Sequence, residues 1–208
     1  MTSAPLAGCI LAGGLARRMG GGDKTLLPLA GAPMLARVIS RLQPQVGAVV
    51  LNANGDAGRF SRFGLPVVAD PIEGFAGPLA GILAGLRWAR AHHGEAQGVI
   101  SVAGDTPFYP ADLARRLLEA RGPDPERIVL ARSDGHMHPV FGYWPVSVAD
   151  SLERFLREGT TRKVLAFVDL HPISAAAFPP EPGAADPFFN INTPEDLDAA
   201  ETRARDEA

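Results

Sequence analysis

Residues 7–43 read AGCILAGGLARRMGGGDKTLLPLAGAPMLARVISRLQ, an apolar run followed by a glycine-rich segment and then by a stretch of helical periodicity. The same order of short apolar runs and longer periodic segments continues at 47–53, 78–91 and 98–103. Runs that are apolar throughout are typical of parallel strands covered by helices on both faces. The alternation therefore predicts βαβ units and a three-layer α/β fold with a mostly parallel sheet.

The second half of the chain shows a different pattern. Residues 128–132 and 139–144 flank a polar turn at 133–135, which predicts a hairpin or an edge strand and makes the sheet mixed. Three further helices are expected, at 146–158, at 161–167 and after Thr193, which can cap the last helix with Pro194 as its first residue. We expect the last helix to pack against the sheet. No long linker divides the chain, so residues 1–208 are predicted to form one domain.

The glycine-rich loop has the composition of an anion site. It holds five glycines between residues 13 and 22, together with Arg17, Arg18 and Lys24. Glycines let backbone N–H groups approach phosphate oxygens, and the cations neutralise a polyphosphate. Neither the P-loop pattern nor the dinucleotide fingerprint GxGxxG is present. The loop is therefore predicted to fold over a triphosphate; the alternative is a surface loop without a ligand.

Lys24 stands out because the chain uses arginine as its ordinary cation. It contains 18 arginines and only two lysines, Lys24 and Lys163. A compact ammonium can approach phosphate oxygens as a point charge, whereas a planar guanidinium requires another geometry. We therefore expect Lys24 to bind phosphate, while the presence of Lys163 is as well explained by chance.

A second candidate lies in VAGDTPF, residues 102–108, where an apolar strand ends in Asp105. Ligands of open α/β sheets bind at the carboxyl ends of strands. A carboxylate there could bind Mg²⁺, which takes one or two carboxylates together with substrate phosphates. The alternative is that Asp105 only caps a helix that starts near Pro110.

Two further strands also end in polar residues. Asn52 and Asn54 follow the run at 47–53, and Asp70 follows the next apolar pair. The carboxylate of Asp70 could accept hydrogen bonds from the N1–H and N2–H₂ donors of guanine, or it could order its own loop. The two asparagines could equally be turn formers.

Composition excludes several classes of function. The net charge of −3 gives no basic field of the kind that nucleic-acid binding needs. The single cysteine, Cys9, excludes an intrachain disulfide, and no window approaches the ~18 apolar residues of a membrane span. We expect a cytoplasmic protein with a small-molecule partner and without nucleic acid or membrane.

Taken in order, the motifs resemble those of the molybdenum cofactor guanylyltransferases. The resemblance covers nearly the whole chain and rests on LAGGLARRMGGGDKTLLPLAG, NAN, GPLAGI, GDTPF, HPVFG and NINTPED. It implies a Rossmann-like, GT-A-type nucleotidyltransferase fold that uses Mg²⁺ and GTP. The phosphate of molybdopterin would attack the α-phosphate, giving the guanine dinucleotide cofactor and pyrophosphate. It also implies transient contact with proteins that mature molybdoenzymes.

The resemblance assigns roles to the residues singled out above. The backbone of Leu11, Ala12, Gly13 and Gly14 would cradle GTP. Lys24 and Arg18 would act on its phosphates, Asn52 and Asp70 would face the base and ribose, and Asp105 would bind the metal. On the pterin side the polar candidates are His138, Arg162, Lys163, Asn190 and Asn192. The N-terminal half would thus bind the nucleotide and the C-terminal half the acceptor.

Other readings remain open from the sequence. The acceptor could be a sugar phosphate, or the donor could be CTP. A carrier that holds GTP or the finished cofactor without turnover needs no magnesium carboxylate, so Asp105 argues against it. An oxidoreductase is disfavoured by the missing dinucleotide fingerprint. A metal bound by His136 and His138 would require a third ligand nearby.

Overall fold

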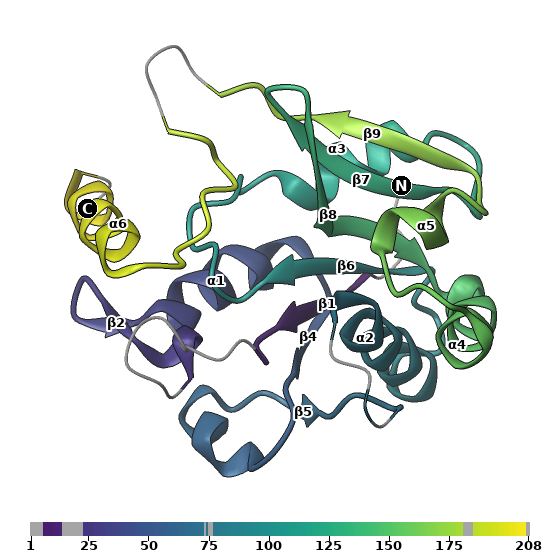
Figure 1. Cartoon of the computed structure of the whole chain (residues 1–208), viewed down its shortest axis with the longest axis horizontal. Helices are drawn as coiled ribbons and strands as arrows, with labels where there is room; N and C mark the ends of the chain where they lie inside the picture. The colour runs from purple at the N-terminus through teal and green to yellow at the C-terminus, as the bar shows by residue number, and fades with distance from the viewer. Residues whose placement is uncertain (1–5, 14–22, 73, 75–76, 181–184, 207–208) are drawn as a thin grey trace.

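The computed structural model describes residues 6–13, 23–72, 74, 77–180 and 185–206. Its centre is a seven-stranded sheet in the order β5-β4-β1-β6-β8-β7-β9 (Figure 1). The strands are β1 (Leu6–Leu11), β4 (Ala48–Asn52), β5 (Val67–Val68), β6 (Gly98–Ala103), β7 (Ile128–Ser133), β8 (His136–Pro145) and β9 (Ile173–Ala177). The α/β fold predicted from the alternating pattern is confirmed.

Four of the six strand pairs are parallel and two are antiparallel. β5, β4, β1 and β6 run parallel, β8 is antiparallel to both of its neighbours, and β7 is parallel to β9. The sheet is therefore mostly parallel and mixed, as predicted. The hairpin of β7 and β8 is also confirmed, but β8 is not an edge strand. It lies between β6 and β7, and residues 141–145 are buried there. The edge strand beyond β7 is β9, which the sequence analysis did not identify.

Helices cover both faces of the sheet. One face carries α1 (Met34–Leu42) and α3 (Leu113–Arg121), and the other carries α2 (Pro78–His92), α4 (Ala149–Glu158) and α5 (Val164–Val168). Successive side chains of a strand point to opposite faces. In β1, Ile10 accordingly packs with α1 whereas Cys9 packs with α2. These two cores on either side of one sheet make the three predicted layers.

Short elements connect the main strands and helices. They are the 3₁₀ turns η1 (Lys24–Leu26), η2 (Gln43–Gln45), η3 (Ala57–Phe63) and η4 (Val146–Val148), and the small hairpin of β2 (Pro28–Leu29) and β3 (Ala32–Pro33). Because α3 begins only at Leu113, Asp105 is not its cap, and that alternative is excluded.

We expected the last helix, α6 (Pro194–Asp206), to pack against the sheet, but it does not. Its buried residues are two alanines, which form a small core with Leu29 of β2 and with Met34 and Phe108. An alanine stripe is too small to cover a sheet face, but it fits closely against the hairpin. Figure 1 shows α6 beside β2, beyond the end toward which β6 points. The predicted cap is confirmed, since Thr193 Oγ1 accepts from the Asp196 N–H at 3.2 Å.

The carboxyl ends of the central strands are level with one another. Leu11 at the end of β1 pairs with Asn52 of β4 and with Ala103 of β6. Just beyond them, the Ala12 N–H donates to Asn52 O at 2.8 Å and the Gly104 N–H donates to Leu11 O at 3.0 Å. The residues that follow these three strands therefore lie side by side where the strands end. We call this side of the sheet its carboxyl edge.

The first turn of α2 approaches this edge closely through Gly81. A Cβ atom built on Gly81 would lie 2.2 Å from Asn52 Oδ1 and 2.7 Å from Leu11 Cδ2. Only a residue without a side chain fits there, so Gly81 keeps α2 packed on the strands and leaves Asn52 in place.

Gly81→Ala is expected to lower the free energy of unfolding by about 1–3 kcal/mol, the cost of overpacking, although glycine to alanine inside a helix is ordinarily favourable. Urea denaturation measures this change. The control is Gly94→Ala, where no atom lies within 4 Å of the added methyl, and it should change stability by less than about 0.5 kcal/mol. Equal stability of the two variants would contradict the close approach at Gly81.

Candidate functional site

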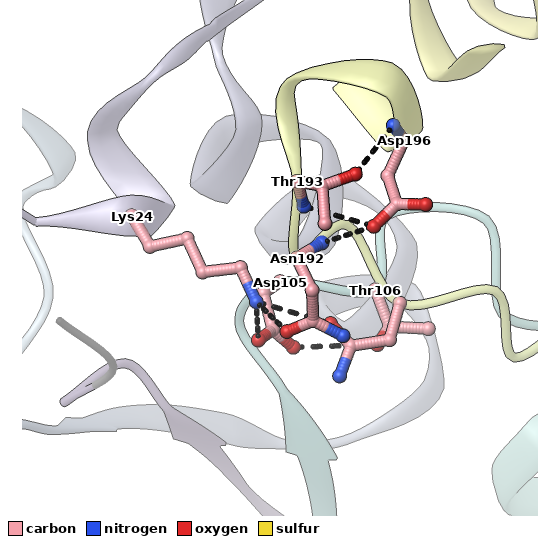
Figure 2. A network of polar contacts seen from close by, with 7 residues as sticks. Lys24, Asp105, Thr106, Asn192, Thr193 and Asp196 are labelled. Carbon is pink, nitrogen blue, oxygen red and sulfur yellow. Dashed lines mark hydrogen bonds and ion pairs between the residues drawn. The ribbon is translucent and has the colours of Figure 1, made fainter. Parts of the chain in front are cut away.

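The polar residues at the carboxyl edge gather in two clusters. The first surrounds the ammonium of Lys24 (Figure 2). Its Nζ lies 2.6 Å from Asp105 Oδ2, 2.6 Å from Asn192 Oδ1 and 3.3 Å from Asn190 Oδ1. We call these four residues the lysine cluster. They come from three segments far apart in the chain, and the sequence had singled out all four.

Local structure explains how each member reaches the cluster. Lys24 begins η1 immediately after Asp23, and its side chain is only 7% exposed. Asp105 follows β6 by two residues, and its carbonyl accepts the Ile191 N–H at 3.1 Å. That backbone hydrogen bond fixes the segment that carries Asn190 and Asn192 against the end of β6.

The first turn of α6 also supports this segment. The carboxylate of Asp196 accepts the N–H groups of Asn192 at 2.8 Å and Thr193 at 2.9 Å. These backbone hydrogen bonds, that of Asn192 above all, lower the pKa of Asp196. The ionised carboxylate therefore satisfies two donors at the start of the helix, as expected where negative charge meets a helix N-terminus.

The lysine cluster has the donor atoms of a site for a hard cation. A lysine ammonium offers three N–H donors, and three oxygen acceptors surround this one. Carboxylate and amide oxygens are also ligands of divalent cations. In the described part of the chain no group of three or more His, Cys, Asp or Glu residues is placed to hold a metal. A metal here would therefore bind through the single carboxylate of Asp105, amide oxygens and ligand atoms.

The second cluster consists of Asn52, Asn54 and Asp70. Asn52 Nδ2 donates to Asp70 Oδ1 at 3.0 Å, and Asn54 Nδ2 donates to Asp70 Oδ2 at 2.8 Å. The Asp70 N–H in turn donates to Asn54 Oδ1 at 2.8 Å. We call this the Asp70 cluster. The two amides fix the plane of the carboxylate, and each oxygen keeps a lone pair for a ligand donor.

Arg59 connects the two clusters, and the sequence analysis did not assign it a role. Its Nε lies 2.5 Å from Asp23 Oδ2, and its Nη2 donates to Asn54 O at 2.7 Å. The guanidinium also lies over the ring of Phe60, 4.5 Å from its centroid. Because Asp23 directly precedes Lys24, Arg59 holds the loop of Asn54 at a fixed place relative to the lysine cluster. The arginine has no sequence signal of its own beyond its charge.

The predicted nucleotide cradle is described only in part. Leu11, Ala12 and Gly13 lie at the end of β1, next to the strand that ends in Asn52. Among the described residues, a Cβ atom built on Gly13 would meet only Ala53 Cα, at 4.0 Å. Gly14, Arg17 and Arg18 lie outside the described residues, so their roles remain predictions.

His138 belongs to a further group of polar side chains at the β7–β8 hairpin. Ser133 Oγ lies 2.6 Å from His138 Nε2 and donates to the carboxylate of Asp186, whose oxygens are 2.9 and 3.0 Å away. The imidazole stacks on Phe188 with a centroid distance of 4.3 Å. Burial lowers the pKa of His138, and the nearby carboxylate of Asp186 opposes this effect. The imidazole is therefore neutral at neutral pH.

This group is not a hydrolytic triad, although it has the residue types. In a triad the carboxylate orients the histidine and the serine contacts the other ring nitrogen. Here Asp186 binds the serine hydroxyl, and the Ser133 residue is almost fully buried. Asp186 also accepts the Phe188 N–H at 2.8 Å. The group fastens the segment before Asn190 to the hairpin.

The remaining acceptor candidates, Arg162 and Lys163, lie just before α5 and are exposed. Arg162 Nη1 donates to Gly74 O at 3.5 Å, in the segment between Asp70 and α2. This contact brings Arg162 close to the chain that follows the Asp70 cluster. The Lys163 backbone N–H donates to Thr161 Oγ1 at 3.3 Å, and its carbonyl accepts the Phe167 N–H at 3.4 Å.

Comparison with known sequences gives a consistent result. A family model described as the MobA-like NTP transferase domain matches residues 8–173. A molybdenum cofactor guanylyltransferase from Bradyrhizobium sp. (strain ORS 278) is 51% identical over 203 residues, which cover 98% of this chain and 95% of that protein. A protein of the same name from Acidiphilium cryptum (strain JF-5) is 49% identical and covers 94% of each chain. The resemblance inferred from the motifs is confirmed.

Solved structures show the same nucleotidyltransferase fold. Molybdopterin-guanine dinucleotide biosynthesis protein A from Archaeoglobus fulgidus is 27% identical, with a TM-score of 0.73 over 96% of this chain and 99% of that one. A Mycobacterium tuberculosis H37Rv protein solved in complex with manganese has a TM-score of 0.66 at 21% identity over 97% of this chain and 100% of that one. At that identity the second likeness concerns the fold alone.

The hydrogen bonds of the Asp186 carboxylate lead to a prediction about the segment that carries Asn190 and Asn192. Asp186→Ala removes the acceptor of the Phe188 N–H and one of the two partners of the Ser133 hydroxyl. Loss of the acceptor of a buried donor costs about 1–3 kcal/mol. Amide hydrogen exchange in residues 188–193 should therefore become faster. Asp198→Ala removes the same charge from an exposed position of α6 and should leave these rates unchanged. Identical exchange in both variants would show that Asp186 does not hold this segment.

Proposed function

Because the chain belongs to the MobA-like NTP transferase family, we propose that it transfers GMP from GTP to the phosphate of molybdopterin. The chain is an enzyme of the nucleotidyltransferase class. The observation that carries this proposal is the arrangement of side chains at the carboxyl edge of the sheet. A buried lysine lies beside a single carboxylate, and the oriented carboxylate of Asp70 lies at the same edge. The first cluster suits phosphates and a metal, and the second suits a purine base with adjacent N–H donors.

The reaction breaks one bond and forms another at the α-phosphorus. An oxygen of the molybdopterin phosphate attacks, the bond from the α-phosphorus to the bridging oxygen breaks, and pyrophosphate leaves with the electron pair. Such transfers need positioning and charge neutralisation but no side-chain nucleophile. Lys24 and Arg18 would neutralise the phosphates, and the backbone of Leu11, Ala12, Gly13 and Gly14 would cradle them.

Base recognition is assigned to the Asp70 cluster. Guanine presents two adjacent donors, N1–H and N2–H₂, which one carboxylate can accept together. Asn52 and Asn54 hold the Asp70 carboxylate in a fixed plane, so the ligand donors meet an acceptor that is already oriented. Adenine and cytosine present a different pattern of donors and acceptors. This difference supports GTP as the donor nucleotide.

The residues of the lysine cluster fit a divalent cation, for which we propose Mg²⁺. Asp105 would be its carboxylate ligand, and Asn190 and Asn192 offer amide oxygens beside it. When bound, the cation supplies charge neutralisation at the α-phosphate and the leaving pyrophosphate. Asp105 and the two asparagines hold the binding position at the end of β6.

We assign the acceptor to the C-terminal half of the chain, within a single functional unit. Asn190 and Asn192 reach the phosphate side directly, whereas His138, Arg162 and Lys163 are candidates for contacts farther along the acceptor. No helix in the described part of the chain combines the length and apolar character that crossing a bilayer requires. We propose a cytoplasmic enzyme that passes its product to molybdoenzyme-maturation proteins by transient contact.

Pyrophosphate release tests the proposal directly. Purified protein with Mg²⁺ and molybdopterin should release pyrophosphate with GTP, and far less with CTP, ATP or UTP or without acceptor. Mass spectrometry should identify the guanine dinucleotide product. Release with CTP, or only with a sugar phosphate acceptor, would replace the assigned substrates, and tight GTP binding without any release would indicate a carrier.

Asp105→Asn keeps the shape of the side chain but removes the charge that binds the metal and pairs with Lys24. Turnover should fall by about 10²–10³-fold, the range found when one charge-stabilising group is lost from an active site. The matched control is Asp169→Asn, an exposed aspartate at the end of α5, which should retain the wild-type rate. A folded Asp105→Asn protein with wild-type turnover would refute the metal assignment.

Asp70→Asn replaces a double acceptor by one acceptor and one donor. The ratio of kcat/KM for GTP to that for ITP, whose base lacks the 2-amino group, should fall by about tenfold or more, since one charge-assisted hydrogen bond is lost. Asp56→Asn is the control, because the side chain of this exposed aspartate caps η3 by accepting the Gly58 N–H in its own loop. An unchanged ratio in Asp70→Asn would remove Asp70 from base recognition.

A further inference from the structure

The ammonium of Lys24 occupies the position in which the proposed divalent cation would bind. Its three N–H donors meet Asp105 Oδ2, Asn190 Oδ1 and Asn192 Oδ1, and these are the same oxygens that a metal would use. Figure 2 shows the side chain of Lys24 extended toward the Asp105 carboxylate and the Asn192 amide. The structure therefore contains a cation in this site, supplied by the protein itself.

Lysine and metal cannot share this position. Mg²⁺ binds oxygen at about 2.1 Å, and the ammonium already lies 2.6 Å from Asp105 Oδ2. Two cations within a few Å of each other in a site with a 7% exposed lysine would repel strongly, because little water screens them. Lys24 and the metal therefore cannot both occupy the position between Asp105 Oδ2 and the two amide oxygens.

We infer that Lys24 is a placeholder cation, which fills the divalent-metal site until nucleotide phosphates draw its ammonium away. The inference rests on the metal assignment proposed above. With Lys24 in the site, the Asp105 carboxylate is paired with a cation at 2.6 Å. A carboxylate that is only 20% exposed would be destabilising without such a partner. When the phosphates of a nucleotide bind Lys24, the three oxygens become free for the metal. Metal binding is thereby coupled to nucleotide binding.

The choice of lysine agrees with this role. An ammonium is a compact charge on a flexible four-carbon stem, so it can move between two sets of oxygens by rotating its own bonds. A guanidinium is planar and larger, and three oxygens converging on one point do not fit its fork. Among 20 basic residues the chain places one of its two lysines here.

The coupling predicts that removing the lysine improves metal binding in the free enzyme. Mn²⁺ serves as the probe, and its affinity is measured by electron paramagnetic resonance without nucleotide or acceptor. Lys24→Met should bind Mn²⁺ at least about tenfold more tightly than wild type, because the competing charge is gone. The control is Lys163→Met, which removes the other, exposed lysine and should bind Mn²⁺ as wild type does.

Two further variants locate the effect. Asp105→Asn should bind Mn²⁺ weakly, and Lys24→Met combined with Asp105→Asn should lose the gain. A folded Lys24→Met protein whose Mn²⁺ affinity is equal to or weaker than that of wild type would overturn the inference. Tighter binding that survives in the double variant would also overturn it, since the metal would then use other ligands.

A measurement on the wild-type protein avoids any question of folding. With ¹³C-labelled lysine the chain gives only two side-chain Cε signals, and Lys163→Met assigns them. Mg²⁺ alone should leave the Lys24 signal in place, whereas Mg²⁺ with a non-hydrolysable GTP analogue should shift it. A Lys24 signal that is unchanged when both are bound would contradict the placeholder. Neither experiment uses turnover or acceptor, so both can succeed even if the proposed transfer reaction is wrong.

Discussion

The ion pair between Lys24 and Asp105 is the interaction on which the rest of the site depends. It joins the turn after the glycine-rich loop to the end of β6, and the asparagine oxygens of the C-terminal segment complete the shell of the ammonium. Two charges removed from water are stable only if they are well paired. The ion pair together with the two asparagine oxygens therefore requires that three distant segments meet at one point. The strand register and the packing of α6 bring these segments together.

The C-terminal segment reaches that point through several small contacts. Asp186 binds the β7–β8 hairpin through Ser133, the Ile191 N–H donates to the Asp105 carbonyl, and Asp196 caps the turn that carries Asn192. The alanine face of α6 then rests on the β2–β3 hairpin, close to Lys24. Each contact is modest, but together they set the position of two amide groups within hydrogen-bonding distance of the ammonium.

Arg59 connects Asn54 to Asp23 and so holds the Asp70 cluster and the lysine cluster at a fixed separation. A nucleotide that spans both clusters needs this separation to match its own length. A preorganised arrangement of this kind reduces the entropic cost of binding a ligand. In the placeholder inference, the lysine cluster by contrast holds a flexible side chain whose place a metal would take. Under the proposed function, the site would thus combine a rigid half that recognises the ligand with a half that rearranges around it.

Much of this protein is determined by its sequence alone. Apolar runs and periodic segments define the three-layer sheet, because burial on both faces requires continuous apolar strands. The polar residues at the ends of those runs identify Asn52, Asp70 and Asp105, since the ends of neighbouring parallel strands share an edge. Lys24 is identified instead by the rarity of lysine in the chain and by its place after the glycine-rich loop. Three features were decided only by the tertiary structure: the interior place of β8, the packing of α6 on a hairpin, and the link through Arg59. They depend on contacts between residues distant in the chain, and such contacts leave no periodicity in the sequence.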